Sequence, residues 1–352
     1  MRELLDGATA VVRGALAAGC DFYAGYPITP ATPILLQMMR LMPGVGGIAV
    51  QGEDEIASIG MCIGAAAAGR RAMTATSGPG LSLYSENIGL ALMAEVPLVI
   101  VDVQRLGPAT GGATVVGQGD VHFARWGTSG GYPLIVLAPS SIPECATLTM
   151  EAFDLAQRFR CPVLLLSDKE LNMTLATVDM PDLAPFDAAA QPSAAAPVFG
   201  NGAVMRLTGS THDERQVMTK DPVAIGQLNE RLIAKIEDHR ADLERVRCDL
   251  QADAATLLVA YGISAGAMQA AARVARAQGR RVSTAAVQSL WPVPERSLQR
   301  AAEGVSRIVV GELNPGLYVR EIRCLFPDIE VIGLQRIDGG LLTPDMVLER
   351  CL

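Results

Sequence analysis

The stretch DFYAGYPITPAT (residues 21–32) decides the fold, because it reads as a strand, a stiff turn and the start of a helix. Residues 21–24 form a short apolar run that predicts a strand. Pro27 and Pro30 fix φ and remove two backbone donors, so the turn is stiff. Thr29 is predicted to be the N-cap of a helix that begins at Pro30. Such a turn is an ordinary strand-to-helix connection, and its heavy stiffening needs a reason from the rest of the chain.

The same unit of strand and helix repeats through the first half of the chain. Apolar runs predict strands at 21–24, 48–51, 72–76, 98–103, 134–138 and 163–167. Apolar residues at helical spacing predict helices over 4–18, 31–42, 53–67, 81–94 and 141–158. This alternation is typical of a doubly wound parallel α/β sheet, which binds ligands outside the carboxyl ends of its strands.

The composition and periodicity of the sequence change in the second half. Proline and alanine without periodicity predict an interdomain linker over 179–202, and a polar loop and a charged helix over 224–250 follow. Strands predicted at 256–262, 282–287, 307–312 and 329–334, with a helix at 264–278, form a second α/β domain. We therefore expect a first domain at 1–178, a linker, loop and long helix at 179–252, and a second domain at 253–352.

Composition excludes several classes of protein. The chain has 352 residues, half of them hydrophobic and 4% aromatic, which is typical of parallel α/β proteins. A formal charge of −8 without a long basic run argues against nucleic-acid and membrane partners. No segment reaches the roughly 18 uninterrupted apolar residues of a membrane span. The N-terminus carries early acids and Arg13 within its apolar part, unlike a signal peptide, so we expect a cytoplasmic protein.

The cysteines and histidines do not suggest a metal centre on this chain. The seven cysteines form no CxxC pair and no cluster with the spacing of iron-sulfur ligands, so any such centre would lie on another chain. The three histidines are scattered and make no metal motif. We therefore expect no metal ligands here.

Three polar segments follow predicted strands. TSGPG (76–80) has glycines that allow close backbone approach, although it is neither a Walker loop nor a GxGxxG fingerprint. Arg105 lies just after the strand at 98–103 and is either a surface ion-pair partner or a fork for a carboxylate. Glu55 is predicted in the first turn of a helix with two other acids, where it favours the helix dipole, and the apolar run after it predicts a half-buried side chain.

Together these segments resemble a known family. GYPITPAT, EDEIASIG, TATSGPG, AEVPLVIVDVQR, QGDVHFARWG and LAPSS are similar to the alpha subunit of the 2-oxoacid:ferredoxin oxidoreductases. TLLVAYGIS, LWPVP and VVGELNPG resemble the transketolase C-terminal domain that follows in this family. GEDEIAS, GPATGG and QGDVHFARWG lean toward the 2-oxoglutarate branch, while the short chain and TGSTHDER are also similar to the branched-chain branch.

The resemblance implies a thiamine diphosphate site divided between chains. The alpha subunit of this family resembles the pyrimidine-binding half. GQGD (117–120) lacks the second glycine and the downstream asparagine of the diphosphate motif, which agrees with a divided site. The glutamate matching Glu55 lies against the aminopyrimidine ring as an acid-base group. The other cofactor-binding positions implied are Tyr26, Pro27, Ser77 and Gly78.

The resemblance also gives the stiff turn a purpose. The threonine and arginine matching Thr29 and Arg105 lie beside the substrate carboxylate, and a rigid turn keeps the hydroxyl aimed without further ordering. The implied reaction converts a 2-oxoacid, coenzyme A and oxidised ferredoxin into acyl-CoA, CO₂ and reduced ferredoxin. 2-Oxoglutarate, giving succinyl-CoA, is the first candidate, and 2-oxoisovalerate and pyruvate are alternatives.

The implied partners are a beta subunit that holds Mg²⁺, the diphosphate and an iron-sulfur cluster, and gamma and delta subunits where the enzyme is divided further. Three other readings stay open: a non-oxidative thiamine-dependent decarboxylase or transketolase-like enzyme, a non-enzymatic scaffold subunit, and a nucleotide-binding protein, which would need a phosphate loop. The segment STHDER (210–215) is either an arm that reaches the acyl-acceptor side or another subunit, or an exposed loop.

Overall fold

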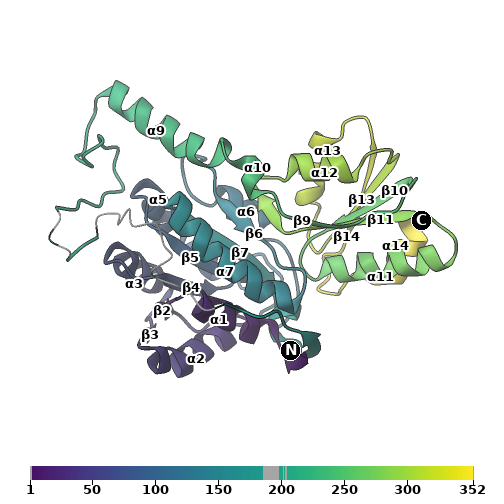
Figure 1. Cartoon of the computed structure of the whole chain (residues 1–352), viewed down its shortest axis with the longest axis horizontal. Helices are drawn as coiled ribbons and strands as arrows, with labels where there is room; N and C mark the ends of the chain where they lie inside the picture. The colour runs from purple at the N-terminus through teal and green to yellow at the C-terminus, as the bar shows by residue number, and fades with distance from the viewer. Residues whose placement is uncertain (1, 185–197, 201, 203, 352) are drawn as a thin grey trace.

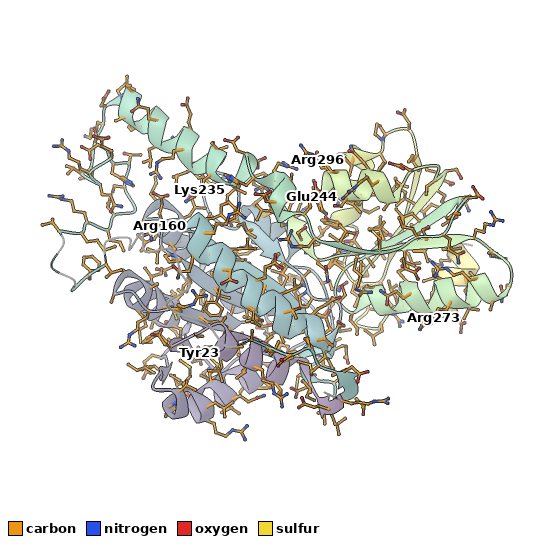
Figure 2. The ribbon with its side chains drawn as sticks, in the orientation of Figure 1. Tyr23, Arg160, Lys235, Glu244, Arg273 and Arg296 are labelled. Carbon is orange, nitrogen blue, oxygen red and sulfur yellow. The ribbon has the colours of Figure 1, made fainter. Side chains whose placement is uncertain are left out.

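The computed structural model describes residues 2–184, 198–200, 202 and 204–351, so most of the predicted linker over 179–202 lies outside the described residues. The chain forms two α/β lobes side by side, the first from residues 2–179 and the second from residues 246–351 (Figure 1). The helix α9 (Pro222–Glu237) lies along the first lobe. Its Lys235 ammonium donates to the Arg160 carbonyl at 3.1 Å and to Glu95 at 3.0 Å (Figure 2).

The first lobe is built on a seven-stranded sheet of order β12-β6-β7-β5-β4-β2-β3. The strands predicted in the first half are confirmed as β2 (Phe22–Gly25), β3 (Ile48–Gln51), β4 (Ala72–Thr76), β5 (Leu98–Gln104), β6 (Ile135–Leu137) and β7 (Pro162–Asp168), and neighbours among them pair in parallel. The seventh strand, β12 (Ser289–Trp291), comes from the second lobe and pairs antiparallel with β6. The prediction therefore missed that one sheet includes both halves of the chain.

Helices cover both faces of this sheet, as predicted. Alternate residues of β5 face opposite ways: Val99 and Val101 join one buried cluster, and Leu98 and Ile100 join the other. One face carries α1 (Gly7–Ala17), α2 (Thr32–Leu41), η1 (Met42–Val45) and α7 (Ile142–Phe159). The other carries α3 (Glu55–Ala67), α4 (Gly78–Leu83), α5 (Ser85–Met93) and α6 (Val121–Trp126). The short α8 (Lys169–Met173) follows β7.

Several predicted helix ends are wrong, and local capping explains two of them. The helix predicted over 4–18 begins only after Asp6, whose side chain accepts from the Thr9 amide at 2.8 Å. Residues 2–5 form β1 (Arg2–Leu5), which pairs antiparallel with β8 (Ala176–Asp179). Asp54 caps α3 in the same way, by accepting from Ala57, so the first acidic residue inside that helix is Glu55. The helix predicted over 81–94 divides at Tyr84 into α4 and α5.

The prediction that Thr29 caps the next helix is also wrong. The helix α2 begins at Thr32, and its N-cap Ala31 makes no side-chain hydrogen bond. The turn is held by other groups: the Thr32 amide donates to the Ile28 carbonyl at 2.9 Å, and the buried Asn172 side chain donates to the Pro30 carbonyl at 2.8 Å. The Thr29 hydroxyl is therefore not used for capping.

The second lobe contains a five-stranded sheet of order β14-β13-β10-β11-β9. The predicted strands are confirmed as β10 (Thr256–Ala260), β11 (Val282–Val287), β13 (Arg307–Glu312) and β14 (Glu330–Gln335). The helices of this lobe are α11 (Ser264–Ala277), α12 (Glu295–Ala301), α13 (Tyr318–Leu325) and α14 (Pro344–Cys351). The single helix predicted over 224–250 is wrong: it is divided into α9, the short α10 (Arg240–Leu243) and the strand β9 (Val246–Asp249). Residues of β9 gain antiparallel pairing with β11, which a continued helix would lose.

Gln118 joins the two lobes. Its side-chain amide donates to the Tyr261 carbonyl at 3.2 Å, and its carbonyl accepts from the Ser264 hydroxyl at 2.9 Å and the Leu313 amide at 3.0 Å. Its backbone carbonyl accepts from the Asn314 side chain at 2.7 Å. The loop that contains Gln118 is therefore fixed to the second lobe by buried hydrogen bonds.

We predict that Gln118→Leu lowers the free energy of unfolding by about 2–4 kcal/mol, because buried donors and acceptors lose their partners at about 1–3 kcal/mol each. Urea unfolding followed by circular dichroism measures the change. The matched control is Gln278→Leu at an exposed position, where we expect little effect. Equal midpoints for wild type and both variants would show that Gln118 does not hold the lobes together.

Candidate functional site

The candidate residues lie at the carboxyl edge of the first sheet. The helices that follow the neighbouring strands β2 and β4 lie on opposite faces of the sheet, α2 on one and α4 on the other. The direction in which the chain adds strands to the sheet therefore reverses between β2 and β4. Ligands of open α/β sheets bind at such a point. Tyr26, Pro27 and Thr29 lie in the turn after β2, Ser77 and Gly78 follow β4, and Arg105 follows β5. The structure thus brings six predicted residues to one edge.

Glu55 reaches the same region from the first turn of α3. It is 7% exposed, so it is more buried than the half-buried side chain that the sequence predicts. It lies against Gly80 of α4, because a Cβ on Gly80 would come within 2.8 Å of the Glu55 Cγ and Oε1 atoms and would overlap the Thr76 hydroxyl. Glycine at position 80 therefore makes room for this carboxyl beside the end of β4.

Two buried hydroxyl groups at the end of β4 lack partners in the described part of the chain. The Thr76 and Ser77 oxygens are buried and have no hydrogen-bond partner among the described residues. Deeper in the core, the Tyr84 and Thr74 hydroxyls are 2.7 Å apart, and burial raises the pKa of Tyr84 well above its usual range. Since buried polar groups are normally paired, free hydroxyls at a ligand-binding edge indicate a place for polar ligand atoms.

Arg105 is not a surface ion-pair residue. It is 6% exposed, and its guanidinium donates to the Thr29 carbonyl at 2.5 Å and to the Thr110 carbonyl at 3.0 Å. Its Nε is buried without a partner among the described residues. Arg105 therefore contacts Thr29 through the backbone of the turn, and the arginine fixes that turn from the end of β5.

Two acidic residues at this edge were missed. Asp102 is fully buried in β5, and Asp120, just before α6, faces it. Burial raises the pKa of Asp120 to about 6 and that of Asp102 well above its usual range, and the neighbouring carboxyl adds to the shift at Asp102. The sequence contained one signal, an acid inside the apolar strand LVIVDVQ. Its partner is 18 positions further along the chain, and its place follows only from the fold.

Exposed apolar side chains occur on the elements that carry the candidate residues. Tyr26 lies in the turn after β2, Ile56 follows Glu55, and Leu83 ends α4, and all three are exposed. Other apolar residues of the same helices are buried, such as Ile59 of α3 and Leu81 of α4. An exposed apolar surface beside a functional edge is typical of an interaction site.

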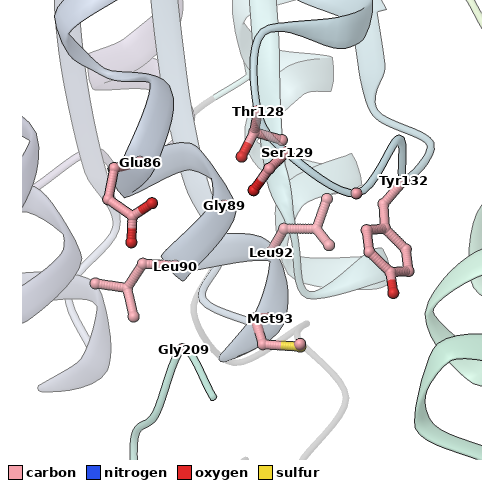
Figure 3. Close-up of a pocket in the computed structure, with 10 residues that line it drawn as sticks. Glu86, Gly89, Leu90, Leu92, Met93, Thr128, Ser129, Tyr132 and Gly209 are labelled. Atoms are coloured by element: carbon pink, nitrogen blue, oxygen red, sulfur yellow. The ribbon is translucent and has the colours of Figure 1, made fainter. Parts of the chain in front are cut away.

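A separate pocket lies away from these residues. It has a volume of about 240 Å³ and is lined by α5, the segment 128–132 and Gly209 (Figure 3). None of the candidate residues lines it. The adjoining segment 210–215 is folded on itself: His212 is buried with its Nδ1 2.9 Å from the Ser210 carbonyl, while Arg215 is exposed and pairs with Asp213.

The described residues contain no group of three or more His, Cys, Asp or Glu side chains arranged to hold a metal ion. The cysteines that the structure describes are free: Cys20, Cys62, Cys145 and Cys161 are buried, and Cys248 and Cys324 are exposed. In the described part of the chain, no helix combines the length and apolar character needed to cross a membrane.

Two family models match the chain. The model for pyruvate flavodoxin/ferredoxin oxidoreductase, a thiamine diphosphate-binding domain, matches residues 13–230. The model for pyruvate:ferredoxin oxidoreductase core domain II matches residues 254–347.

The chain is similar to curated proteins over its full length. It is 39% identical to the 2-oxoglutarate synthase subunit KorA of Methanothermobacter marburgensis, covering 99% of this chain and 98% of that protein. It is 40% identical to KorA of Archaeoglobus fulgidus, covering 99% and 97%. It is also 38% identical to the ketoisovalerate oxidoreductase subunit VorB of Methanothermobacter thermautotrophicus, covering 99% and 96%.

Two solved structures are also similar. The 2-oxoglutarate:ferredoxin oxidoreductase from Magnetococcus marinus, with 2-oxoglutarate, coenzyme A and succinyl-CoA bound, matches with a TM-score of 0.89 and 30% identity. The match covers 99% of this chain and 64% of that one. A split gene transketolase matches with a TM-score of 0.58 and 11% identity, which shows a similar fold alone.

Proposed function

This chain belongs to the pyruvate flavodoxin/ferredoxin oxidoreductase family, and we propose that it is the alpha subunit of an enzyme that oxidises 2-oxoglutarate to succinyl-CoA and CO₂ with reduction of ferredoxin. The observation that carries this proposal is the full-length similarity to subunits named 2-oxoglutarate synthase. The first domain at 1–178, the linker, loop and long helix at 179–252 and the second domain at 253–352 remain our proposed boundaries. The family match at 254–347 supports the start of the second domain, whereas the first match continues to residue 230, beyond our first boundary.

The residues at the sheet edge fit the aminopyrimidine half of thiamine diphosphate. The Glu55 carboxyl and the unpartnered Thr76 and Ser77 hydroxyls offer polar contacts to a heterocycle with ring nitrogens and an amino group. Tyr26, exposed in the turn after β2, offers an apolar one. We propose that Glu55, Tyr26, Pro27, Ser77 and Gly78 hold this half of the cofactor.

When bound, thiamine diphosphate supplies the carbon nucleophile that reacts with the oxoacid carbonyl. The role proposed for Glu55 is to hold and move a proton at a nitrogen of the aminopyrimidine ring. The roles proposed for Arg105 and Thr29 concern the substrate: the guanidinium binds its carboxylate through N–H groups that are not bonded to the Thr29 and Thr110 carbonyls, and the Thr29 hydroxyl orients it. A partner subunit that covered Tyr26, Ile56 and Leu83 would exclude water from the site at the sheet edge.

We propose that a beta subunit covers this edge and holds the diphosphate, Mg²⁺ and an iron-sulfur cluster, with gamma and delta subunits where the enzyme is divided further. The exposed apolar side chains support such a contact. The ligand spacing of iron-sulfur sites is missing from the sequence, which supports placing the cluster on the partner. A cytoplasmic location remains our prediction.

We predict that this chain, purified alone under anaerobic conditions, is colourless and does not reduce an artificial acceptor. The physical reason is that its cysteines are too scattered to share a cluster. Iron and acid-labile sulfide analysis, with visible absorption, measures the content. Stoichiometric iron and sulfide on the pure chain would contradict the assignment of the cluster to a partner.

A second substrate is favoured by one observation, the 38% identity to a ketoisovalerate oxidoreductase subunit. The test is acceptor reduction by the co-expressed complex with coenzyme A and each of 2-oxoglutarate, 2-oxoisovalerate and pyruvate. We expect the highest kcat/KM for 2-oxoglutarate. A higher value for 2-oxoisovalerate would move the enzyme to the branched-chain branch, and decarboxylation without acceptor reduction would support a non-oxidative enzyme.

A further inference from the structure

The loop between β5 and α6 carries Arg105 at one end and Asp120 at the other. Its far end is fixed twice. Gln118 joins it to the second lobe, and the Asp120 amide donates to the Gln104 side chain at 3.2 Å. Asp102, near the end of β5, faces the Asp120 carboxyl across the base of the loop. Two carboxyl groups thus meet where the two ends of the Arg105 loop come together.

These carboxyl groups have no cation bonded to them in the described chain. Both Asp102 oxygens and the Asp120 Oδ2 are buried without a hydrogen-bond partner among the described residues. Arg105 is the charged group that faces the pair, but the hydrogen bonds of its guanidinium go to the Thr29 and Thr110 carbonyls. On the neighbouring strands, β4 places Thr76 and β7 places Leu166 beside Asp102, and neither carries a charge.

Two ionised carboxylates in this position would repel each other across the loop base. Asp102 is fully buried and Asp120 is half-buried with its Oδ2 atom inside the protein, so the two neighbouring carboxyl groups cannot both be charged at low cost, and one of them keeps a proton. With that proton, one carboxyl donates a hydrogen bond to the other and the base of the loop is closed. Without it, the same two groups push the ends of the loop apart.

We propose that Asp102 and Asp120 share a proton in the resting enzyme and act as positioning residues, because their hydrogen bond closes the base of the loop that carries Arg105. This inference rests on the proposed function only in assigning the substrate carboxylate to Arg105. The pair also adjoins the proposed cofactor turn, since a Cβ on Gly78 would lie 3.4 Å from each Asp120 carboxyl oxygen. A move of Asp120 therefore affects both the turn after β4 and the loop after β5.

The proton is assigned to the fully buried Asp102, and the Asp102 hydroxyl donates a hydrogen bond to the ionised Asp120 carboxylate. Burial raises the pKa of both carboxyl groups, more for Asp102, so Asp120 loses its proton near pH 6 and Asp102 loses it at higher pH. An unfolded aspartate ionises at about pH 3.9. The folded chain thus binds more protons than the unfolded chain, and this pair makes the free energy of unfolding fall as the pH rises from that value.

The test uses Asp102→Asn and Asp120→Asn, with Asp328→Asn at an exposed position as the matched control. An asparagine at 102 donates an N–H to Asp120 at every pH. In the complex with its partner, we expect the wild-type KM for 2-oxoglutarate to rise on the alkaline side toward a limiting slope of about tenfold per pH unit. The profile of Asp102→Asn should stay flat there, and that of the Asp328→Asn control should follow wild type.

Two measurements on the full chain do not depend on the reaction. The infrared band of a protonated carboxyl group at pH 7 should be present in wild type and Asp328→Asn and absent in Asp102→Asn. The free energy of unfolding should fall less with pH in Asp102→Asn than in wild type. For Asp120→Asn we expect the infrared band to be lost as well, because the new amide donates to an ionised Asp102.

The outcomes separate the two proposals. The absence of the protonated band in wild type, or identical KM profiles for wild type and Asp102→Asn, would overturn the proton-sharing pair. A band that disappears in both variants of the pair, in a complex that oxidises none of the 2-oxoacids, would support the pair and contradict the proposed function.

Discussion

Glu55→Gln in the assembled complex is expected to lower turnover with 2-oxoglutarate by at least the ~10² typical of losing a general acid-base group. The change keeps the size of the side chain, so its packing against Gly80 is preserved and the fold and assembly should be unaffected. Proton exchange at the thiazolium carbon of bound thiamine diphosphate, followed by NMR, should slow in parallel with turnover. Steady-state kinetics and this exchange rate are the two measurements.

The matched control for this prediction is Glu53→Gln. Glu53 is exposed and lies before the capping residue of α3, whereas Glu55 is buried and approaches Gly80 together with the Thr76 hydroxyl. We expect Glu53→Gln to behave as wild type. A loss of exchange in the Glu53 variant, with normal exchange in the Glu55 variant, would transfer the acid-base role to Glu53.

Arg105→Ala should raise the KM for 2-oxoglutarate by about 10- to 100-fold, since a charge-assisted hydrogen bond contributes roughly 1.5–3 kcal/mol. The structure adds a second effect, because the guanidinium also holds the Thr29 carbonyl. Thr29→Val, nearly equal in volume, keeps this carbonyl contact and loses the hydroxyl alone. It should therefore lower kcat more than it raises KM, by loosening the orientation of the substrate.

The affinity of the complex for thiamine diphosphate distinguishes a substrate site at the turn after β2 from a cofactor site there. Neither variant should change it much, because the diphosphate is proposed to bind the partner chain. Arg40→Ala, at an exposed position on α2, is the control for the loss of a positive charge. If Thr29→Val weakens cofactor binding and leaves the KM for the oxoacid unchanged, the turn after β2 holds the cofactor and not the substrate.

The strands of the first sheet were predictable because each is a short apolar run, and the central strands β4, β5 and β7 are buried on both faces of a parallel sheet. The helix ends were less predictable, since Asp6 and Asp54 fix them through local hydrogen bonds that hydrophobic periodicity does not register. The strand β12 was missed for another reason. Three residues carry too little pattern, and their pairing with β6 is specified only when the two lobes meet.

At the site, the family resemblance named residues that the fold brings to one edge. It did not reveal how they are held. The sequence left Arg105 as either a surface ion-pair partner or a fork for a carboxylate, whereas the structure buries it against two backbone carbonyls. The Asp102 and Asp120 pair depends on the path of the loop after β5, which its sequence alone does not specify. Gln118 likewise has no distinguishing sequence signal, and its role follows from the contact between the lobes.

An omission experiment with purified subunits under anaerobic conditions tests whether this chain is an essential subunit of a 2-oxoglutarate:ferredoxin oxidoreductase. Ferredoxin reduction is measured with 2-oxoglutarate, coenzyme A, thiamine diphosphate and Mg²⁺ present, and then with this chain, its partner or coenzyme A left out in turn. We expect rapid reduction in the complete mixture and none when either subunit or coenzyme A is missing. Full reduction by the partner without this chain, or no reduction by the complete mixture with any 2-oxoacid, would contradict it.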